Sequence, residues 1–167
     1  MKKLGSLFRD LTKDFRFTIA FVILLALLFL AILSFFSPYH PQRMYQVPRG
    51  RPPSWKHPLG TNWLGQDVFW QLTFAVRNSL LIAIVASSIS RVIAIFVGMV
   101  AGYRGGLVDR ILMIIGDTTM VLPSLVVLIV VSTILREWVS HLANLGLLLA
   151  FFSWAWDARV IRSQILS

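Results

Sequence analysis

Two ionisable side chains stand inside long apolar runs of the sequence, where a charge is rare and usually has a function. Arg91 interrupts the run 79–103, and Asp117 lies within the run 111–135. At about 1.5 Å per residue, counted from the turn that joins the two runs, both side chains reach a similar depth. Because an unpartnered charge inside a membrane is costly, the sequence predicts that Arg91 pairs with Asp117.

Hydroxyl groups surround a proline in the second of these runs. Thr118, Thr119 and Ser124 lie close to Pro123 in the sequence. A proline inside a helix usually kinks it and frees backbone carbonyl groups, which nearby hydroxyls can satisfy. A structural kink is the simpler interpretation, and the lining of a solute pathway is the functional alternative.

The sequence lacks the usual patterns of metal sites and enzymes. His40 and His57 are far apart, with no cysteine or carboxylate at ligand spacing, so we expect surface histidines and no metal site. A phosphate-binding G-x-x-x-x-G-K-[ST] loop, an H-E-x-x-H motif and a nucleophile elbow are all missing from the sequence. We therefore predict no catalytic residue, no cofactor in this chain and no enzymatic activity.

The composition is typical of a membrane protein. Of the 167 residues, 57% are hydrophobic and only 14% are charged, and the mean hydropathy is +0.75, which is too apolar for a soluble surface. The formal net charge is +9, but the basic residues are spread over tails and loops without an aromatic-interleaved patch. Membrane lipids with anionic headgroups are therefore the expected partners, and nucleic acid is not.

The apolar runs predict an all-α integral membrane protein with four transmembrane helices, at 17–36, 79–103, 111–135 and 142–161. A basic tail, 1–16, precedes the first helix, which we interpret as an uncleaved span rather than a signal peptide. In the loop 37–78, the segment 38–58 contains six of the seven prolines and is expected to be extended, exposed and without regular structure. Within it, a short amphipathic helix should begin at Val68 and lie on the membrane surface.

Small residues recur at every fourth position of the predicted helix 79–103. This spacing places them on one helix face, where they allow another helix to approach closely. We expect packing within the chain first and contact with another subunit second. The residues of this small-residue stripe are Ala86, Ser90, Ala94, Gly98 and Gly102.

Several segments together resemble one family of membrane proteins. The run HPLGTNWLGQDV, followed by AVRNSLLIA, is similar to the stretch before the second span of ABC-transporter permeases of the oligopeptide and dipeptide class. In that class, an acid usually stands where this chain has Asn62, and an arginine where it has Gln66. The runs AGYRGGLVDR, DTTMVLPSL and WAWDARVIRSQILS resemble the family's first cytoplasmic turn, third span and fourth span.

The resemblance implies where the first of these motifs lies. In the family, this loop faces the outside, where a binding protein docks. A neutral amide pair between Asn62 and Gln66 is expected to replace any salt bridge that relatives form there. The outer-face motif comprises Gly60, Thr61, Asn62, Gly65, Gln66 and Asp67.

The resemblance also implies a fold and an orientation. The four predicted spans would belong to the six-span permease of a type I ABC importer, and 79–167 would be a truncated transmembrane domain that ends before the cytoplasmic E-A-A loop and two further spans. With a cytoplasmic amino terminus, nine lysines and arginines lie inside and six outside, which favours this orientation. The expected location is the cytoplasmic (inner) membrane of a bacterium or archaeon.

The partners and the solute are likewise implied by the family. The expected partners are a second permease subunit, two ATP-binding subunits that hold ATP and Mg²⁺, and a periplasmic or lipid-anchored solute-binding protein. Each permease would form half of the solute pathway, with peptides as the expected solute and oligosaccharides or nickel as alternatives. Two other classes remain open: a membrane-embedded enzyme or assembly subunit that uses Asp117 and Arg91, and a purely structural subunit.

Overall fold

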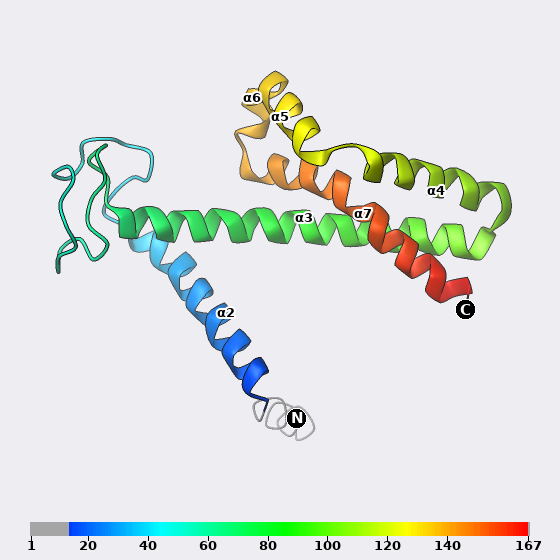
Figure 1. Ribbon diagram of the computed structural model, residues 1–167, viewed down its shortest axis with the longest axis horizontal. Helices are drawn as coiled ribbons and strands as arrows, with labels where there is room; N and C mark the ends of the chain where they lie inside the picture. The colour runs from blue at the N-terminus through cyan, green and yellow to red at the C-terminus, as the bar shows by residue number, and fades with distance from the viewer. Residues whose placement is uncertain (1–13, 167) are drawn as a thin grey trace. The chain divides into compact units, whose positions relative to one another are not determined.

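The computed structural model describes residues 14–166, and every regular element in this range is a helix. The chain divides between Ser79 and Leu80 into two compact units. Most of the predicted tail 1–16 lies outside the described residues. The elements, shown in Figure 1, are α2 (Phe15–Leu33), η1 (Ser34–Phe36), α3 (Val68–Arg104), α4 (Gly106–Val121), α5 (Ser124–Ile134), α6 (Arg136–Val139) and α7 (Leu142–Leu166).

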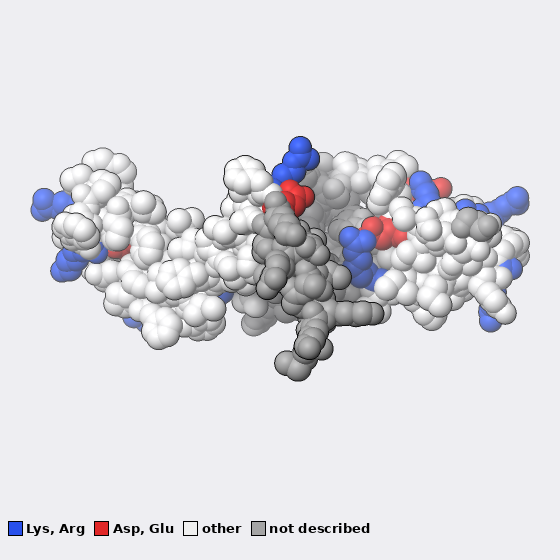
Figure 2. Space-filling model, turned by 90° about the horizontal axis from the view of Figure 1, so that it is seen from below, with Lys and Arg blue, Asp and Glu red and all other residues white. Residues whose placement is uncertain are grey.

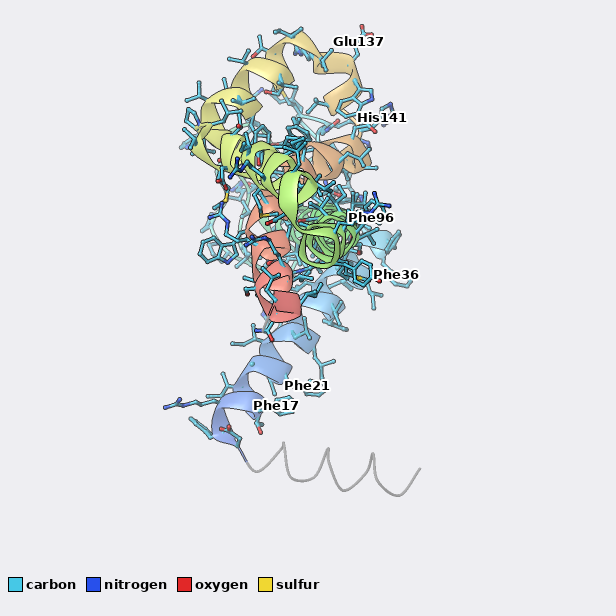
Figure 3. All side chains as sticks on the ribbon, turned by 90° about the vertical axis from the view of Figure 1, so that its right-hand side faces the viewer. Phe17, Phe21, Phe36, Phe96, Glu137 and His141 are labelled. Carbon is cyan, nitrogen blue, oxygen red and sulfur yellow. The ribbon has the colours of Figure 1, made fainter. Side chains whose placement is uncertain are left out.

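The first described element of the first unit is an apolar helix of the length needed to cross a membrane. Asp14 caps α2, because its side chain accepts a hydrogen bond from the backbone N–H of Arg16 at 2.9 Å. Phe17 and Phe21 extend from α2 (Figure 3), and their rings stack with centroids 6.1 Å apart. Together, α2 and η1 cover Phe15–Phe36, close to the predicted span 17–36.

The loop between η1 and α3 is folded. Its segment 38–58 is mostly exposed and contains no helix or strand, as predicted, but it is not extended, and that part of the prediction is wrong. The Tyr45 N–H donates to the carbonyl of Leu64 at 2.9 Å, and the Thr61 N–H donates to the carbonyl of Arg51 at 3.0 Å. Gly60, with a φ of 73°, allows the second approach, since a Cβ there would lie 2.5 Å from the Arg51 oxygen. These bonds satisfy backbone groups that the many prolines keep out of regular structure.

α3 is one helix of 37 residues, whereas the sequence predicted a short surface helix followed by a separate span at 79–103. The reason is that Val68 to Val97 contains neither proline nor glycine, so nothing interrupts the backbone hydrogen bonds. At 1.5 Å per residue, α3 is about 55 Å long, well above the roughly 30 Å of a hydrocarbon core.

In the second unit, the predicted helix 111–135 is two helices. α4 and α5 meet at an angle of 82°, a larger change of direction than the predicted kink. Pro123 has no N–H to continue α4, and its carbonyl instead accepts from Val126 at 2.9 Å as α5 begins. Leu122 is extended, with ψ at 129°, as residues before proline generally are.

α7 supplies most of the buried centre of the second unit. It continues to Leu166, beyond the predicted end of its span at 161. Trp154, Ala155 and Ala158 of α7 are buried with Ala94 of α3. α7 also runs beside α4 (Figure 1). It therefore contacts both other long elements of this unit.

The number of apolar helices long enough to cross a membrane is lower than predicted. By length and composition, the described residues contain two such helices, Phe15–Phe36 and Val68–Arg104, or three if α4 and α5 count as one span. α7 is not among them, because Asp157, Arg159 and Arg162 lie in its second half. The all-helical membrane class is confirmed, and the fourth span stays a prediction.

Candidate functional site

Arg91 pairs with α7 and not with Asp117, so the predicted pair is wrong. Its Nη1 lies 2.6 Å from Oδ1 of Asp157. Ser90, next to Arg91, is buried on the face of α3 that packs against α7. The prediction compared depths on two consecutive helices, but α7 is the neighbour that this part of α3 contacts, and it carries an acid at the right level.

Asp117 forms an ion pair with an arginine other than Arg91. Arg159 of α7 pairs with Asp117, and Arg162, one turn further, donates two hydrogen bonds to Asp109 near the start of α4. Asp109 and Arg162 lie outside the predicted spans. The hydrogen bonds from Arg162 lower the pKa of Asp109 from its ordinary value; desolvation opposes this shift, and the charge of Arg162 adds to it.

A pocket lined by apolar side chains and three hydroxyl groups lies where α4 and α5 separate. Its volume is about 350 Å³, and α7 closes one side. Thr119 and Ser124, both predicted for the solute pathway, line it, with Pro123 between them at the bend. Ser153 and Trp156 of α7 also line it; sequence reasoning missed both, although a serine and a tryptophan one turn apart in an apolar run were a usable signal.

The other predicted pathway residues lie elsewhere. Thr118 and Asp117 line a separate hollow on α4. The Thr118 hydroxyl donates to the carbonyl of Ile114 at 2.8 Å, and that of Thr119 donates to Gly116 at 2.7 Å. Both hydroxyls therefore stabilise their own helix and keep acceptor capacity for a solute or water.

The small-residue stripe of α3 faces α7. A Cβ at Gly98 would lie 2.6 Å from the carbonyl oxygen of Ala158, and one at Gly102 would lie 2.9 Å from Cβ of Ile165. Ala94 and Ser90 are buried, and Ala86 is half-buried. The two backbones can approach this closely only because the side chains between them are small.

The outer-face motif is built around a buried contact between a histidine and a carboxylate. Nδ1 of His57 lies 2.6 Å from Oδ2 of Asp67, and the Asp67 side chain is fully buried. The expectation of a surface histidine is therefore wrong for His57, whereas His40 is exposed. A carboxylate ten residues away was outside the spacing searched, and the fold of the loop joins the two.

Asn62 and Gln66 form the neutral pair that their positions suggested. Nδ2 of Asn62 donates to Oε1 of Gln66 at 2.9 Å, and Nε2 of Gln71 donates to the same oxygen at 2.7 Å. Oδ1 of Asn62 accepts the backbone N–H groups of Leu64 and Gln66, each at 3.0 Å. Glycines with positive φ at positions 60 and 65 shape the turn that brings these groups together.

This network predicts that Asn62→Asp alone destabilises the loop. The side-chain NH₂ of Asn62 donates to Oε1 of Gln66, whereas a carboxylate oxygen at the same place would repel that oxygen. The expected loss is about 1–3 kcal/mol. Asn62→Asp with Gln66→Arg, which restores the usual pair of the family, should recover most of it. Thermal unfolding of wild type and the two variants in mild detergent measures this, and a double variant as unstable as the single one would contradict it.

The ion pairs predict which charges are coupled. In double-mutant cycles with leucine, Arg91 should show a coupling of about 0.5–3 kcal/mol with Asp157 and none with Asp117. Asp117 should couple with Arg159 instead. Unfolding in a mixed-detergent titration gives the energies. Strict additivity for Arg91 and Asp157, or coupling between Arg91 and Asp117, would show that the pairs differ from those described.

Comparison with known proteins places the chain among transport permeases. Residues 94–167 match the family described as binding-protein-dependent transport system inner membrane component. The dipeptide transport system permease protein DppC of Bacillus subtilis (strain 168) is 34% identical over 145 residues, which cover 86% of this chain and 44% of the relative.

Two relatives named as oligopeptide transport system permease protein OppC are also similar. The protein of Mycobacterium tuberculosis (strain ATCC 25618 / H37Rv) is 38% identical over 117 residues, 70% of this chain and 40% of the relative. That of Bacillus subtilis (strain 168) is 29% identical over 170 residues, 99% of this chain and 55% of the relative. The chain spans about half the length of these curated relatives. It belongs to the binding-protein-dependent inner-membrane transport components, and within them to the permeases of the peptide class.

Proposed function

We propose that this chain is part of a permease subunit of an ATP-driven importer of peptides and contributes helices to its half of the solute pathway. The observation that carries the proposal is the similarity over 86% of the chain to a permease named for dipeptide transport. The role is that of a transport subunit and not of an enzyme. Hydrolysis of ATP with Mg²⁺ belongs to partner subunits.

The pocket at the break between α4 and α5 is the part of the molecule that best fits a solute pathway. Broken helices in transporters expose backbone polar groups where a solute passes. Here hydroxyls from Thr119, Ser124 and Ser153 stand beside the indole of Trp156. Peptides carry amide donors and acceptors with apolar side chains, and a pocket that mixes hydroxyl and apolar groups can contact both kinds of group.

The proposed assembly contains a second permease subunit, two ATP-binding subunits and a periplasmic or lipid-anchored solute-binding protein. Its proposed place is the inner membrane of a bacterium or archaeon. The outer-face motif would lie on the side where the binding protein docks, and α7 would be the fourth span. The pairs that α7 forms with Arg91 and Asp117 support the last point, since both residues lie within predicted spans, where an unpartnered charge would be costly.

A chimera tests the transport function. Residues 17–167 of this chain would replace the aligned segment of the Bacillus subtilis DppC protein, in cells that lack their own copy. We expect uptake of a radiolabelled dipeptide to be restored. A chimera that reaches the membrane at normal abundance but imports neither dipeptides nor longer peptides would contradict the proposal, and uptake of an oligosaccharide or of nickel instead would change the solute.

Two matched substitutions in the chimera test the pocket. Ser153→Phe would fill the pocket and should reduce uptake without lowering the amount of protein in the membrane. Ser132→Phe makes the same change on α5, and Ser132 does not line this pocket. Equal uptake by the two variants would move the pathway away from the break.

The main alternative class, a membrane-embedded enzyme or assembly subunit, depended on a pair formed by Asp117 and Arg91. The structure gives each of them a different partner. This alternative therefore has no geometric support, whereas the permease proposal does not require the pair.

The proposed orientation predicts a labelling pattern. The chain has no cysteine, so single cysteines can be placed at Ser6, outside the described residues, and at Ser54 in the loop. An impermeant maleimide applied to intact cells should label Ser54→Cys and leave Ser6→Cys unlabelled. Both variants should react after permeabilisation. Labelling of Ser6→Cys alone in intact cells would reverse the topology.

A further inference from the structure

Arg77 is held between two aromatic rings from different elements of the first unit. Its guanidinium carbon lies 4.7 Å from the ring centroid of Phe74 in α3 and 5.2 Å from that of Phe35 in η1. Both distances are within the range of cation–π attraction. The two rings restrict where the guanidinium can lie, which lowers the entropy it loses when it binds an anion.

Among the described residues, no carboxylate lies within ion-pair distance of Arg77. Its contacts with Oδ1 of Asn78, at 3.4 and 3.5 Å, are long. A guanidinium has five N–H donors in a planar fork that matches carboxylate and phosphate oxygens. Arg77 is half-buried, so water cannot surround the group freely, and most of its donors have no acceptor among residues 14–166.

The residues around Arg77 add positive charge. Between Ser37 and Asn78 the basic side chains are Arg43, Arg49, Arg51, Lys56 and Arg77, and the single acid, Asp67, is buried against His57. Figure 2 shows basic groups on the surface of this loop. An anion that approaches this part of the molecule therefore meets a positive field without a competing exposed carboxylate.

The position of Arg77 in the sequence identifies the kind of anion. The next twelve residues of α3 after Asn78 contain no charge, and Phe35 lies at the end of the uncharged run 17–36. Arg77 therefore marks the level at which both apolar segments end, which is where lipid headgroups lie. Phe35 and Phe36, about three-quarters exposed, would lie beside the upper acyl carbons.

We infer that Arg77 binds the phosphate group of an anionic phospholipid at the membrane interface. The guanidinium, oriented by Phe35 and Phe74, donates to the phosphate oxygens, and its positive charge favours a lipid with a net negative charge over a zwitterionic one. The site would anchor the start of α3 at the boundary of the hydrocarbon layer, and it is independent of the solute that the permease carries.

Native mass spectrometry of the full chain, released from detergent that contains equal amounts of phosphatidylglycerol and phosphatidylcholine, tests the site. Wild type should retain one phosphatidylglycerol about fivefold more often than phosphatidylcholine, as expected for about one favourable basic contact. Arg77→Gln should lose this preference. Arg49→Gln is the matched control, because Arg49 also lies over a ring, that of Tyr45 at 4.3 Å, but in the loop; it should keep the preference.

Three other results of these experiments would contradict a phospholipid site at Arg77. Equal retention of the two lipids by wild type, or an equal loss in Arg49→Gln, would show that only diffuse charge attracts the lipid. Protection of wild type against heat by inorganic phosphate as well as by phosphatidylglycerol would replace the lipid with free phosphate. If Arg77→Gln loses its helical circular dichroism, Phe35→Leu, which keeps every charge, serves in its place; an unchanged preference in that variant would contradict the role of the rings.

Discussion

Gly98→Ala is expected to lower the free energy of unfolding by about 1–3 kcal/mol, although it adds a single methyl group. The new Cβ would lie 2.6 Å from the backbone oxygen of Ala158 and 2.9 Å from Cβ of Ile161. A backbone oxygen cannot rotate away, so α7 must move as a whole. That movement would weaken the pairs that Asp157 and Arg162 form. Gly98→Leu should prevent folding to a detergent-stable protein.

Gly116→Ala is the matched control for this prediction. Gly116 is also a helical glycine next to α7, but a Cβ there would lie 3.5 Å from Cβ of Ala155, an ordinary contact. Alanine is favoured over glycine in a helix by about 1 kcal/mol, so this variant should be as stable as wild type or more stable. Thermal unfolding in one detergent compares the two. Equal stability of both variants would show that the stripe does not contact α7 as described.

The sequence predicted the positions of apolar helices better than their ends or their continuity. The first span and the start of α7 at Leu142 agree with the structure within two residues. The predicted division of α3 near Asn78 is wrong, because polar residues on one face change the hydrophobic pattern without breaking the backbone. At Pro123 the opposite happened: the apolar pattern continues across the proline, while the chain turns by 82°.

The contacts that could not be predicted depend on which segments of the chain become neighbours in the fold. Depth along two helices suggested Arg91 and Asp117, yet each charge also had a candidate on α7, and the sequence does not say which helices are neighbours. The buried pair of His57 and Asp67 needed the fold of the loop, which is held by backbone bonds between segments ten or more residues apart. The Asn62 and Gln66 pair was predictable because both lie within a single turn.

Asp67→Ala should have the largest effect of any single change in the loop, because one carboxylate stabilises three groups there. Oδ2 accepts from Nδ1 of His57 at 2.6 Å, and Oδ1 accepts from the backbone N–H groups of Phe69 and Trp70 at 2.9 and 3.2 Å. The second set is the amino-terminal cap of α3, worth about 0.5–2 kcal/mol. Leaving buried His57 without a partner adds about 1–3 kcal/mol.

Asp67→Asn separates the two contributions. The asparagine oxygen can still cap α3, while the negative charge beside His57 is lost. We therefore expect Asp67→Asn to be intermediate in stability between wild type and Asp67→Ala. His57→Ala should likewise be milder than Asp67→Ala, because it leaves the cap of α3 intact.

Limited trypsin digestion in detergent measures this effect at the loop itself. Arg43, Arg49 and Lys56 are exposed but lie in a segment whose backbone is hydrogen-bonded across the loop, so cleavage requires local opening. The rate of cleavage after these residues should rise about thirtyfold or more in Asp67→Ala, the factor that corresponds to about 2 kcal/mol of lost local stability. The rise should be smaller in Asp67→Asn. Cleavage of Asp67→Ala at the wild-type rate would mean that the loop keeps its fold without this carboxylate. The hydrogen bonds of Asp67 with His57 and with the start of α3 would then contribute little to the stability of the loop.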